Sequence, residues 1–203
     1  MDQAQTGNST RNARALSRFH TPHRFTLNGT YQLPVFRGRK DTVGRLFGGW
    51  QLAAVVKLIH GTPFTVIDLL GGDLNFDGFS ENRPVIVDTS ILGTGVSHPD
   101  TSREKLPRAA FRRATFGDFG GDVIGRNTFY GDGVRNVDFG LYKSFATVGG
   151  QRLITRFELY NAFNRAQFAF PVTDFNNANF GRIVGTANTY RARTLQLTLR
   201  YQF

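Results

Sequence analysis

The last ten residues of the chain, Thr194 to Phe203, read TLQLTLRYQF. Apolar side chains occupy every second position, and Thr, Gln or Arg stands at each position between them. Successive side chains of a β-strand point to opposite faces, so this pattern predicts a strand with one apolar and one polar face. The apolar face consists of Leu195, Leu197, Leu199, Tyr201 and Phe203.

Further segments of the chain alternate in the same way, at residues 24–33, 50–59, 136–145 and 152–160. Lys143 is the one charged residue that interrupts the apolar positions of residues 136–145. Segments of this length exceed the usual globular strand of about five or six residues, and they match the roughly 9 to 11 residues that cross a bilayer at a tilt. The sequence predicts an all-β protein that forms an antiparallel transmembrane β-barrel segment with about five long strands.

The connections between these segments alternate in length. Residues 34–49 and 146–151 form the shorter connections, and residues 60–135 and 161–193 form the longer ones. Outer-membrane barrels have short periplasmic turns and long external loops, so the first strand is expected to run toward the periplasm and Phe203 to lie at the periplasmic rim. Closed bacterial barrels have at least about eight strands, so about five strands predict an incomplete barrel. Residues 62–68 and 83–88 are candidates for additional strands.

Composition excludes several classes of protein. The 203 residues include no Cys, which excludes disulfide scaffolds, thiolate zinc sites and cysteine nucleophiles. No apolar run approaches the ~18 to 20 residues of a membrane helix. The net charge is +10, but only Arg112 and Arg113 are adjacent arginines, so no basic tail favours nucleic-acid binding. Residues 1–17 are polar, are expected to be disordered and lack the apolar core of a signal peptide.

A set of motifs carries a family resemblance. In chain order they are GGWQL at 48–52, GTPF at 61–64, GRNTF at 125–129, YNAFNRAQF at 160–168 and the terminal alternating strand. Together they resemble the last strands of TonB-dependent outer-membrane receptors, and most closely the large Oar-like barrels that begin with a carboxypeptidase-regulatory-like domain. The resemblance covers residues 18–203, which are expected to form the C-terminal part of such a barrel.

The resemblance implies a function and a set of partners. Such a receptor lies in the cell outer membrane and takes up a substrate with energy from the TonB complex, which it contacts through an N-terminal box and plug that this chain lacks. The chain is therefore expected to be a fragment, inactive alone, that supplies wall strands and external loops. Residues 61–134 and 164–190 are the expected substrate-facing surface, and the substrate is unknown. The alternating residues of the last strand resemble the signal that the barrel assembly machinery reads.

Candidate sites for chemistry are few. Asp73, Asn75 and Asp77 precede Gly78 with the spacing that begins a calcium loop, but Pro84 stands where a bidentate Glu belongs, so a polar turn is the alternative. His20, His23, His60 and His98 show no metal-ligand pattern. Arg156 and Glu158 share the polar face of one predicted strand and are interpreted as interior charges. The chain is not expected to be an enzyme, and it has no candidate catalytic residue. Calcium at that weak candidate site is the one cofactor considered.

Aromatic residues of the predicted strands, most of them near strand ends, suit the girdles that barrels place at the membrane interfaces. They are Tyr31, Trp50, Phe139, Phe145, Tyr201 and Phe203. Two alternatives remain open on the sequence: a small stand-alone outer-membrane barrel acting as a pore, adhesin or structural element, and a soluble basic binding domain.

Overall fold

The protein is described by a computed structural model that covers residues 14–74, 76, 78, 82–92, 105–118, 125–188 and 190–203. The chain divides into two compact units. The strand unit contains residues 24–59, 134–166 and 189–203. The loop unit contains residues 1–23, 60–133 and 167–188. Each unit has its own sheets and its own hydrogen bonds, and each is described by itself below.

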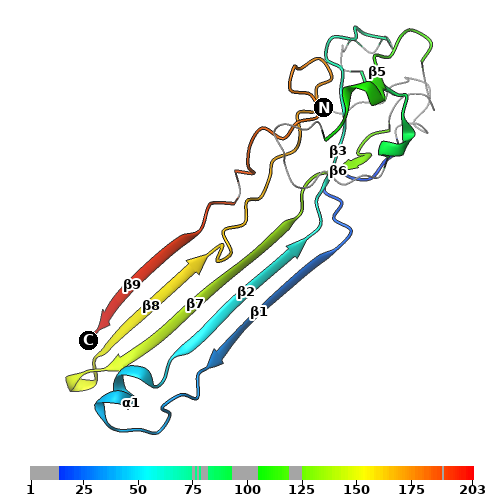
Figure 1. Cartoon of the computed structure of the whole chain (residues 1–203). Coiled ribbons are helices and arrows are strands. Elements are labelled where there is room, and N and C mark those ends of the chain that lie inside the picture. The colour runs from blue at the N-terminus through cyan, green and yellow to red at the C-terminus, as the bar shows by residue number, and fades with distance from the viewer. Residues whose placement is uncertain are drawn as a thin grey trace. The chain divides into compact units, whose positions relative to one another are not determined.

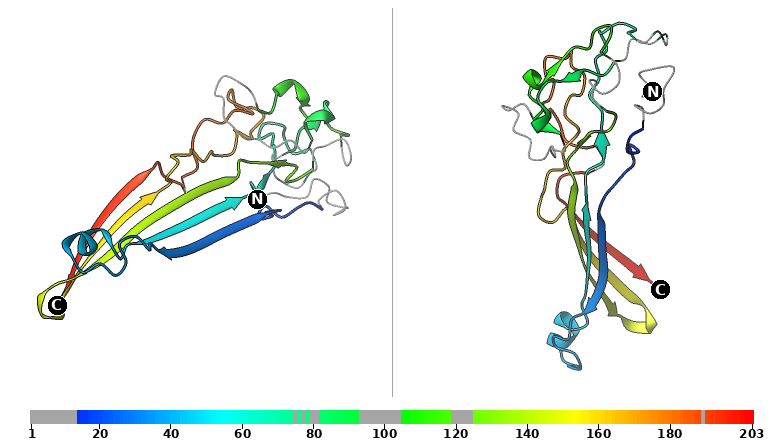
Figure 2. Two further views of the ribbon diagram at one scale, coloured as in Figure 1. Left: turned by 60° about the horizontal axis from the view of Figure 1, so that its bottom comes forward. Right: turned by 90° about the vertical axis from the view of Figure 1, so that its right-hand side faces the viewer.

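The strand unit is a five-stranded antiparallel sheet with the order β1-β2-β7-β8-β9 (Figure 1). Its strands are β1 (Arg24–Gln32), β2 (Gln51–Ile59), β7 (Val134–Ala146), β8 (Arg152–Tyr160) and β9 (Thr194–Gln202). All five strands predicted from alternation are confirmed, with bounds that differ by at most two residues. Two further views show the same strands side by side (Figure 2).

The register between strands continues the alternation across the whole sheet. Tyr31, Leu52, Leu141, Phe157 and Leu197 are successive cross-strand partners in β1, β2, β7, β8 and β9. The neighbouring row, one residue further along, is polar: Gln32, Gln51, Tyr142, Arg156 and Thr198. A slip of one residue in any strand would move its apolar side chains to the other face, so the side-chain pattern fixes the register.

The sheet is not closed. Its order places β1 and β9 at the two edges, and each of them pairs with one neighbour. Every residue of β1 is exposed, and so is every residue of β9 except Thr198. The prediction of an all-β, antiparallel, incomplete barrel is confirmed in the residues that the structure describes.

The two shorter connections join strands at the same end of the sheet. The connection from β1 to β2 contains a short helix, α1 (Thr42–Phe47), which the sequence did not predict. Asp41 caps α1, since its carboxylate accepts a hydrogen bond of 2.9 Å from the backbone nitrogen of Gly44. The connection from β7 to β8 contains the 3-10 turn η5 (Val148–Gly150), where Gly149 and Gly150 take φ values of 76° and 81° that side chains disfavour.

The loop unit contains two small sheets. In one, β3 (Pro63–Phe64) pairs with β6 (Phe129–Tyr130), and in the other β4 (Val85–Ile86) pairs with β5 (Phe111–Arg112). Two 3-10 turns, η2 (Thr89–Ile91) and η3 (Arg108–Ala110), accompany them. The candidate strands at 62–68 and 83–88 are therefore present as two-residue strands of separate small sheets.

The loop unit has a hydrophobic core of its own. Two ring pairs show its packing: Phe111 meets Phe180 edge to face at a centroid distance of 5.4 Å, and Phe64 lies 5.9 Å from Phe129. Such aromatic pairs hold loops that contain little regular structure. The core consists of Phe64, Val66, Leu106, Ala110, Phe111, Phe129, Phe180 and Ile183.

Candidate functional site

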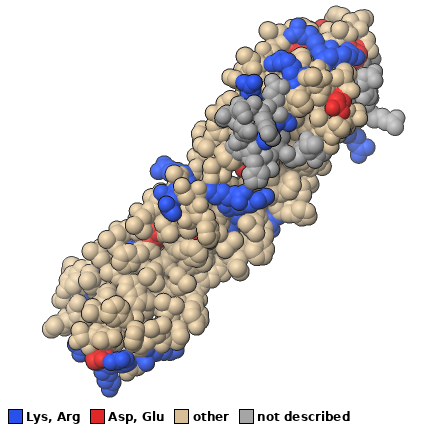
Figure 3. Space-filling view, in the orientation of Figure 1, with Lys and Arg blue, Asp and Glu red and all other residues tan. Residues whose placement is uncertain are grey.

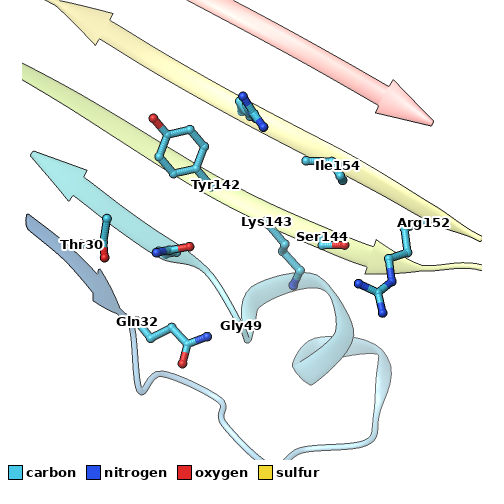
Figure 4. A pocket seen from close by; sticks show the side chains of 10 residues that line it. Thr30, Gln32, Gly49, Tyr142, Lys143, Ser144, Arg152 and Ile154 are labelled. Atoms are coloured by element: carbon cyan, nitrogen blue, oxygen red, sulfur yellow. The ribbon is translucent and has the colours of Figure 1, made fainter. Parts of the chain in front are cut away.

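The polar face of the strand unit is hollowed near the end that carries α1. The hollow measures about 560 Å³, and side chains from β1, β2, β7 and β8 contribute to it (Figure 4). Its lining residues are Thr30, Gln32, Gly49, Gln51, Tyr142, Lys143, Ser144, Arg152, Ile154 and Arg156. Hydroxyl, amide and guanidinium groups dominate this lining, so the hollow suits water or a polar ligand.

Tyr142 and its neighbours form a cluster of contacts on this face. The Tyr142 hydroxyl donates a hydrogen bond of 3.1 Å to Glu158, and the Arg156 guanidinium lies 5.8 Å from the centre of the Tyr142 ring. The ring lies over Gly140, where an added Cβ would stand 2.3 Å from the Tyr142 oxygen. Glycine at position 140 therefore makes room for the tyrosine. Arg156 and Glu158, predicted as interior charges, both contact the same tyrosine.

A second hollow of about 330 Å³ lies on the strand unit. It is lined by Lys57, Asn136, Asp138, Tyr160, Asn161, Tyr190, Arg191, Ala192 and Thr194. Asp138 anchors it, because one of its carboxylate oxygens accepts from Asn136 at 2.8 Å and from the backbone nitrogen of Asn161 at 2.9 Å.

The two asparagines of the motif YNAFN form the turn at the end of β8. Asn161 and Asn164 adopt left-handed φ values of 49°, which asparagine tolerates better than most residues. The Asn161 amide donates to the carbonyl of Arg191 at 3.1 Å, and the Asn164 side chain accepts from the backbone nitrogen of Arg193 at 3.0 Å. These bonds tie the end of β8 to the segment that enters β9. The sequence analysis used this motif only as a resemblance; the signal for its role was the pair of asparagines three residues apart.

The other face of the strand unit is apolar and exposed. The predicted assembly residues on β9 all lie on it or at its end, with Leu195 70% exposed and Phe203 fully exposed. The side of the molecule seen in Figure 3 carries few charges along the sheet, whereas Lys and Arg gather at the end with α1. Recognition of β9 by the assembly machinery stays a prediction.

Lys143, which interrupts the apolar alternation, binds the end of α1. Its ammonium donates hydrogen bonds to the carbonyl oxygens of Arg45 at 2.6 Å, of Leu46 at 3.0 Å and of Gly48. It also lies 4.6 Å from the ring centre of Phe145 and 5.6 Å from that of Trp50. Carbonyls at the C-terminal end of a helix attract a cation. Three backbone carbonyls therefore bind the ammonium group on the apolar face, and these hydrogen bonds hold α1 at that face.

Trp50 and Phe145, two of the predicted girdle aromatics, lie together at this end. Their ring centres are 6.4 Å apart, and the Trp50 nitrogen donates to the carbonyl of Leu46 at 3.1 Å. The ring centres of Tyr201, on β9, and Phe203, just after β9, lie 6.5 Å apart. Phe139, by contrast, is in the middle of β7, away from either end of the strand.

A buried carboxylate organises the loop unit. Asp68 is fully buried, and it accepts hydrogen bonds from Arg113 at 2.9 Å, from the Asn176 amide at 2.6 Å and from the backbone nitrogen of Leu70 at 3.1 Å. Charged partners of this kind compensate the cost of burying an ionised group. The sequence analysis missed this cluster because its members lie far apart in the chain.

Carboxylates at exposed turns are also held by local partners. The Arg112 guanidinium and the Thr115 hydroxyl and amide hold the pKa of Asp118 well below its usual range. In the same way, hydrogen bonds from Arg39 and Gly44 lower the pKa of Asp41, and bonds from Ser90 lower the pKa of Asp88. These groups stay ionised and keep their turns closed at neutral pH.

The structure describes one residue of the calcium candidate. Asp73 accepts a hydrogen bond of 2.8 Å from the backbone nitrogen of Gly78, as in a polar turn, while Asn75 and Asp77 lie outside the described residues. No group of three or more His, Cys, Asp or Glu that could hold a metal ion occurs among the described residues. His23 and His60 have ring centres 6.4 Å apart, and His98 lies outside the described residues. Calcium binding stays a prediction.

None of the helices among the described residues has the length and hydropathy of a membrane-spanning segment. The strand unit has strands of nine or more residues, one exposed apolar face and one polar face with hollows lined by polar side chains. These features define the wall of a membrane-spanning antiparallel barrel. The family model of the outer membrane beta barrel domain matches residues 1–196, so the chain belongs to this family and is located in the outer membrane. Both the barrel fold and the location are confirmed.

Two further comparisons give no relatives. Neither the curated proteins nor the solved structures include a match to this chain.

Proposed function

We propose that this chain forms part of the wall and the external loops of a TonB-dependent outer-membrane receptor, similar to the Oar-like barrels. The observation that carries the proposal is the five-stranded sheet itself, apolar on one face, polar on the other and open at both edges. The motifs GGWQL, GTPF, GRNTF and YNAFNRAQF support this particular receptor class.

The open edges support a larger barrel. Within a bilayer no water is present to bind the unpaired backbone groups of an edge strand, so each one costs several kcal/mol. β1 and β9 each leave one side unpaired in the described sheet. Additional strands, from the same protein or from a second protein chain, would satisfy these backbone groups. A barrel of about 22 strands is the size expected of a receptor with an internal plug.

The polar face supports an interior role. Its hollows present the hydroxyl of Tyr142, the guanidinium of Arg156 and the carboxylate of Asp138. In large barrels such a face lines a water-filled lumen or contacts a plug. The loop unit, which includes most of the expected substrate-facing residues 61–134 and 164–190, would then contact the substrate outside the membrane.

The remaining assignments follow from this role. The chain acts without enzymatic chemistry and without a cofactor. Its partners are outer-membrane lipid and the barrel assembly machinery, and the TonB complex acts through plug and box segments outside these residues. It is inactive as an isolated piece.

Refolding tests the barrel part of the proposal. The full 203-residue chain, refolded in detergent and run unboiled on a gel, should give no compact heat-modifiable band, because the open sheet cannot close. A compact band from the chain alone would favour a stand-alone barrel. Recovery of a monomer without detergent would favour a soluble domain.

Uptake in cells tests the transport part. A strain that lacks the full-length receptor, of which this chain would be a part, is compared with one that carries it, for uptake of a panel of labelled nutrients. Uptake restored by the full-length receptor should stop when an uncoupler collapses the proton gradient that powers the TonB complex. Restored uptake that persists with the uncoupler would indicate a passive pore.

A further inference from the structure

We infer that the connection between β1 and β2, residues 34–49, is a lipid-binding element that lies in the membrane interface and binds the headgroups of anionic phospholipids. The inference goes beyond TonB-dependent uptake, since it needs only that the strand unit spans the membrane. Three observations on this connection carry it: its exposed apolar side chains, its unpaired basic groups and its attachment to the lipid-facing side of the sheet.

Apolar side chains of this connection are exposed in the part of the chain that the structure describes. Leu46 and Phe47 are 51% and 59% exposed, and Val35, Phe36 and Val43 are exposed as well. The ring centres of Phe36 and Phe47 lie 6.3 Å apart, so they form one surface. An element that presents such side chains beside basic ones lies in the interface with its apolar side in the acyl region.

Basic side chains surround this apolar surface. The same connection contains Arg37, Arg39, Lys40 and Arg45 against a single acidic residue, Asp41, which pairs with Arg39. The guanidinium groups of Arg37 and Arg45 make no ion pair or hydrogen bond in the part of the chain that the structure describes. Two unpaired guanidiniums complement the phosphate of a phospholipid, and further negative charge on its headgroup increases the attraction.

A groove brings the charges and the apolar groups together. It measures about 650 Å³ and runs between the connection and the end of β7. Arg37, Arg39 and Arg45 line one side, and Phe145 and Val148 line the other. Its volume falls in the ~300–1,000 Å³ range of small-molecule sites. A headgroup in this groove would have guanidinium donors beside it and exposed apolar side chains for the first acyl carbons.

The groove borders the surface that faces lipid, because Lys143 and Phe145 of the apolar face line it, beside Ser144 of the polar face. Lys143 and Trp50 belong to the apolar face of the sheet, and both donate hydrogen bonds to carbonyls at the C-terminal end of α1. The lipid that covers Leu52, Leu141 and Phe157 therefore reaches this end of the sheet. Lysine and arginine gather at the same end in Figure 3.

Trp50, the only tryptophan of the chain, lets this element be observed directly. The full chain is incorporated into phosphatidylcholine vesicles that contain an equal fraction of either brominated phosphatidylglycerol or brominated phosphatidylcholine. Brominated phosphatidylglycerol should quench Trp50 about two- to threefold more strongly, because the basic groove concentrates the anionic lipid near it. Equal quenching by the two lipids overturns the inference.

Variants separate a local site from net charge. The double variant Arg37→Gln and Arg45→Gln should lose the excess quenching, whereas Arg37→Lys with Arg45→Lys should keep most of it. The control Arg24→Gln with Arg200→Gln removes the same charge from the polar face and should keep the excess. Loss of the excess in this control overturns the inference. The emission maximum of Trp50 in pure phosphatidylcholine should be the same in all variants.

A soluble competitor separates lipid from free phosphate. Glycerol 3-phosphate is added at about 10 mM, a concentration at which a weak soluble competitor would bind. The excess quenching should stay unchanged, because the acyl chains of the lipid contribute to binding and glycerol 3-phosphate has none. Relief of the quenching by glycerol 3-phosphate would identify a soluble phosphate site and overturn the lipid assignment.

Discussion

Lys143 shows how one residue can contradict a pattern and still support the structure that the pattern predicts. On the sequence it is the only charge among the apolar positions of residues 136–145. In the structure its ammonium binds carbonyls of Arg45, Leu46 and Gly48, which come from a connection about a hundred residues earlier. No local pattern contains this information, since α1 itself was not predictable from a connection with little helical periodicity.

Replacing Lys143 with Met tests this role. The change removes a charged donor from several carbonyls, which costs about 1–3 kcal/mol, and it relieves a charge near the interface, which gains at most about 1 kcal/mol. We expect a net loss in the free energy of unfolding and a red shift of Trp50 emission as α1 detaches. Urea unfolding in vesicles, followed by Trp50 fluorescence, measures both.

Lys57→Met is the matched control for that variant. Lys57 lies on the polar face beside the second hollow, and its removal should change the unfolding free energy by less than about 0.5 kcal/mol. An equal loss in both variants would show that Lys143 has no special role.

Asp118 gives a pH prediction at the residue scale. Its pKa is lowered, first by Arg112 and then by Thr115, so the folded state binds the proton less tightly than the unfolded state does. The stabilisation is therefore complete above the unfolded pKa, ~3.9, and is lost as pH falls through the lower folded pKa. Carboxyl carbon NMR of the full chain in micelles, assigned with Asp118→Asn, should show a midpoint well below 3.9. A titration midpoint of Asp118 at the ordinary carboxyl value would contradict the hydrogen bonds that Arg112 donates to it.

At the scale of elements, the long strands were predictable and the loop unit was not. Alternation within β9 specifies its two faces, and the same alternation in its neighbours fixes the register, so the information is local. The core of the loop unit joins Phe64, Phe129 and Phe180, which lie in segments with no regular period. The polar cluster around Asp68 likewise depends on Arg113 and Asn176 from distant segments. The polar face of the candidate site follows from the strands, but its hollows do not.

The two faces of β9 predict opposite effects of the same substitution. Leu197 lies on the apolar face opposite Phe157, and Gln196 lies on the polar face opposite Glu158. Leu197→Arg should reduce stability in the membrane by about 2–4 kcal/mol, because the guanidinium would face lipid near the middle of the strand. Gln196→Arg should be tolerated, since Glu158 provides an acidic neighbour. The amount of each variant in the outer-membrane fraction and its urea midpoint measure the difference. Equal tolerance of both variants would contradict the assignment of the two faces.

At the scale of the whole molecule, the antiparallel order and the connection lengths predict which end of the sheet faces which side of the membrane. Residues 33–50 and 147–151 join strands at one end, and the segments 60–133 and 161–193 leave from the other. Short turns face the periplasm in outer-membrane barrels, so the α1 end should be periplasmic and the loop unit external. The sequence alone already contained this prediction, because it depends on connection lengths and not on side-chain packing.

Cysteine labelling tests this orientation, and the absence of native Cys leaves no background. Leu70 in the loop unit is 71% exposed and Val148 in the η5 turn is 91% exposed, so both sites accept a reagent. In intact cells a membrane-impermeant maleimide should label the Leu70→Cys variant and should label Val148→Cys only after the outer membrane is permeabilised. Leu199→Cys should react in neither case, because its side chain faces lipid. Labelling of Val148→Cys but not Leu70→Cys in intact cells would mean that the sheet has the opposite orientation, and labelling of both would mean that it does not span the membrane.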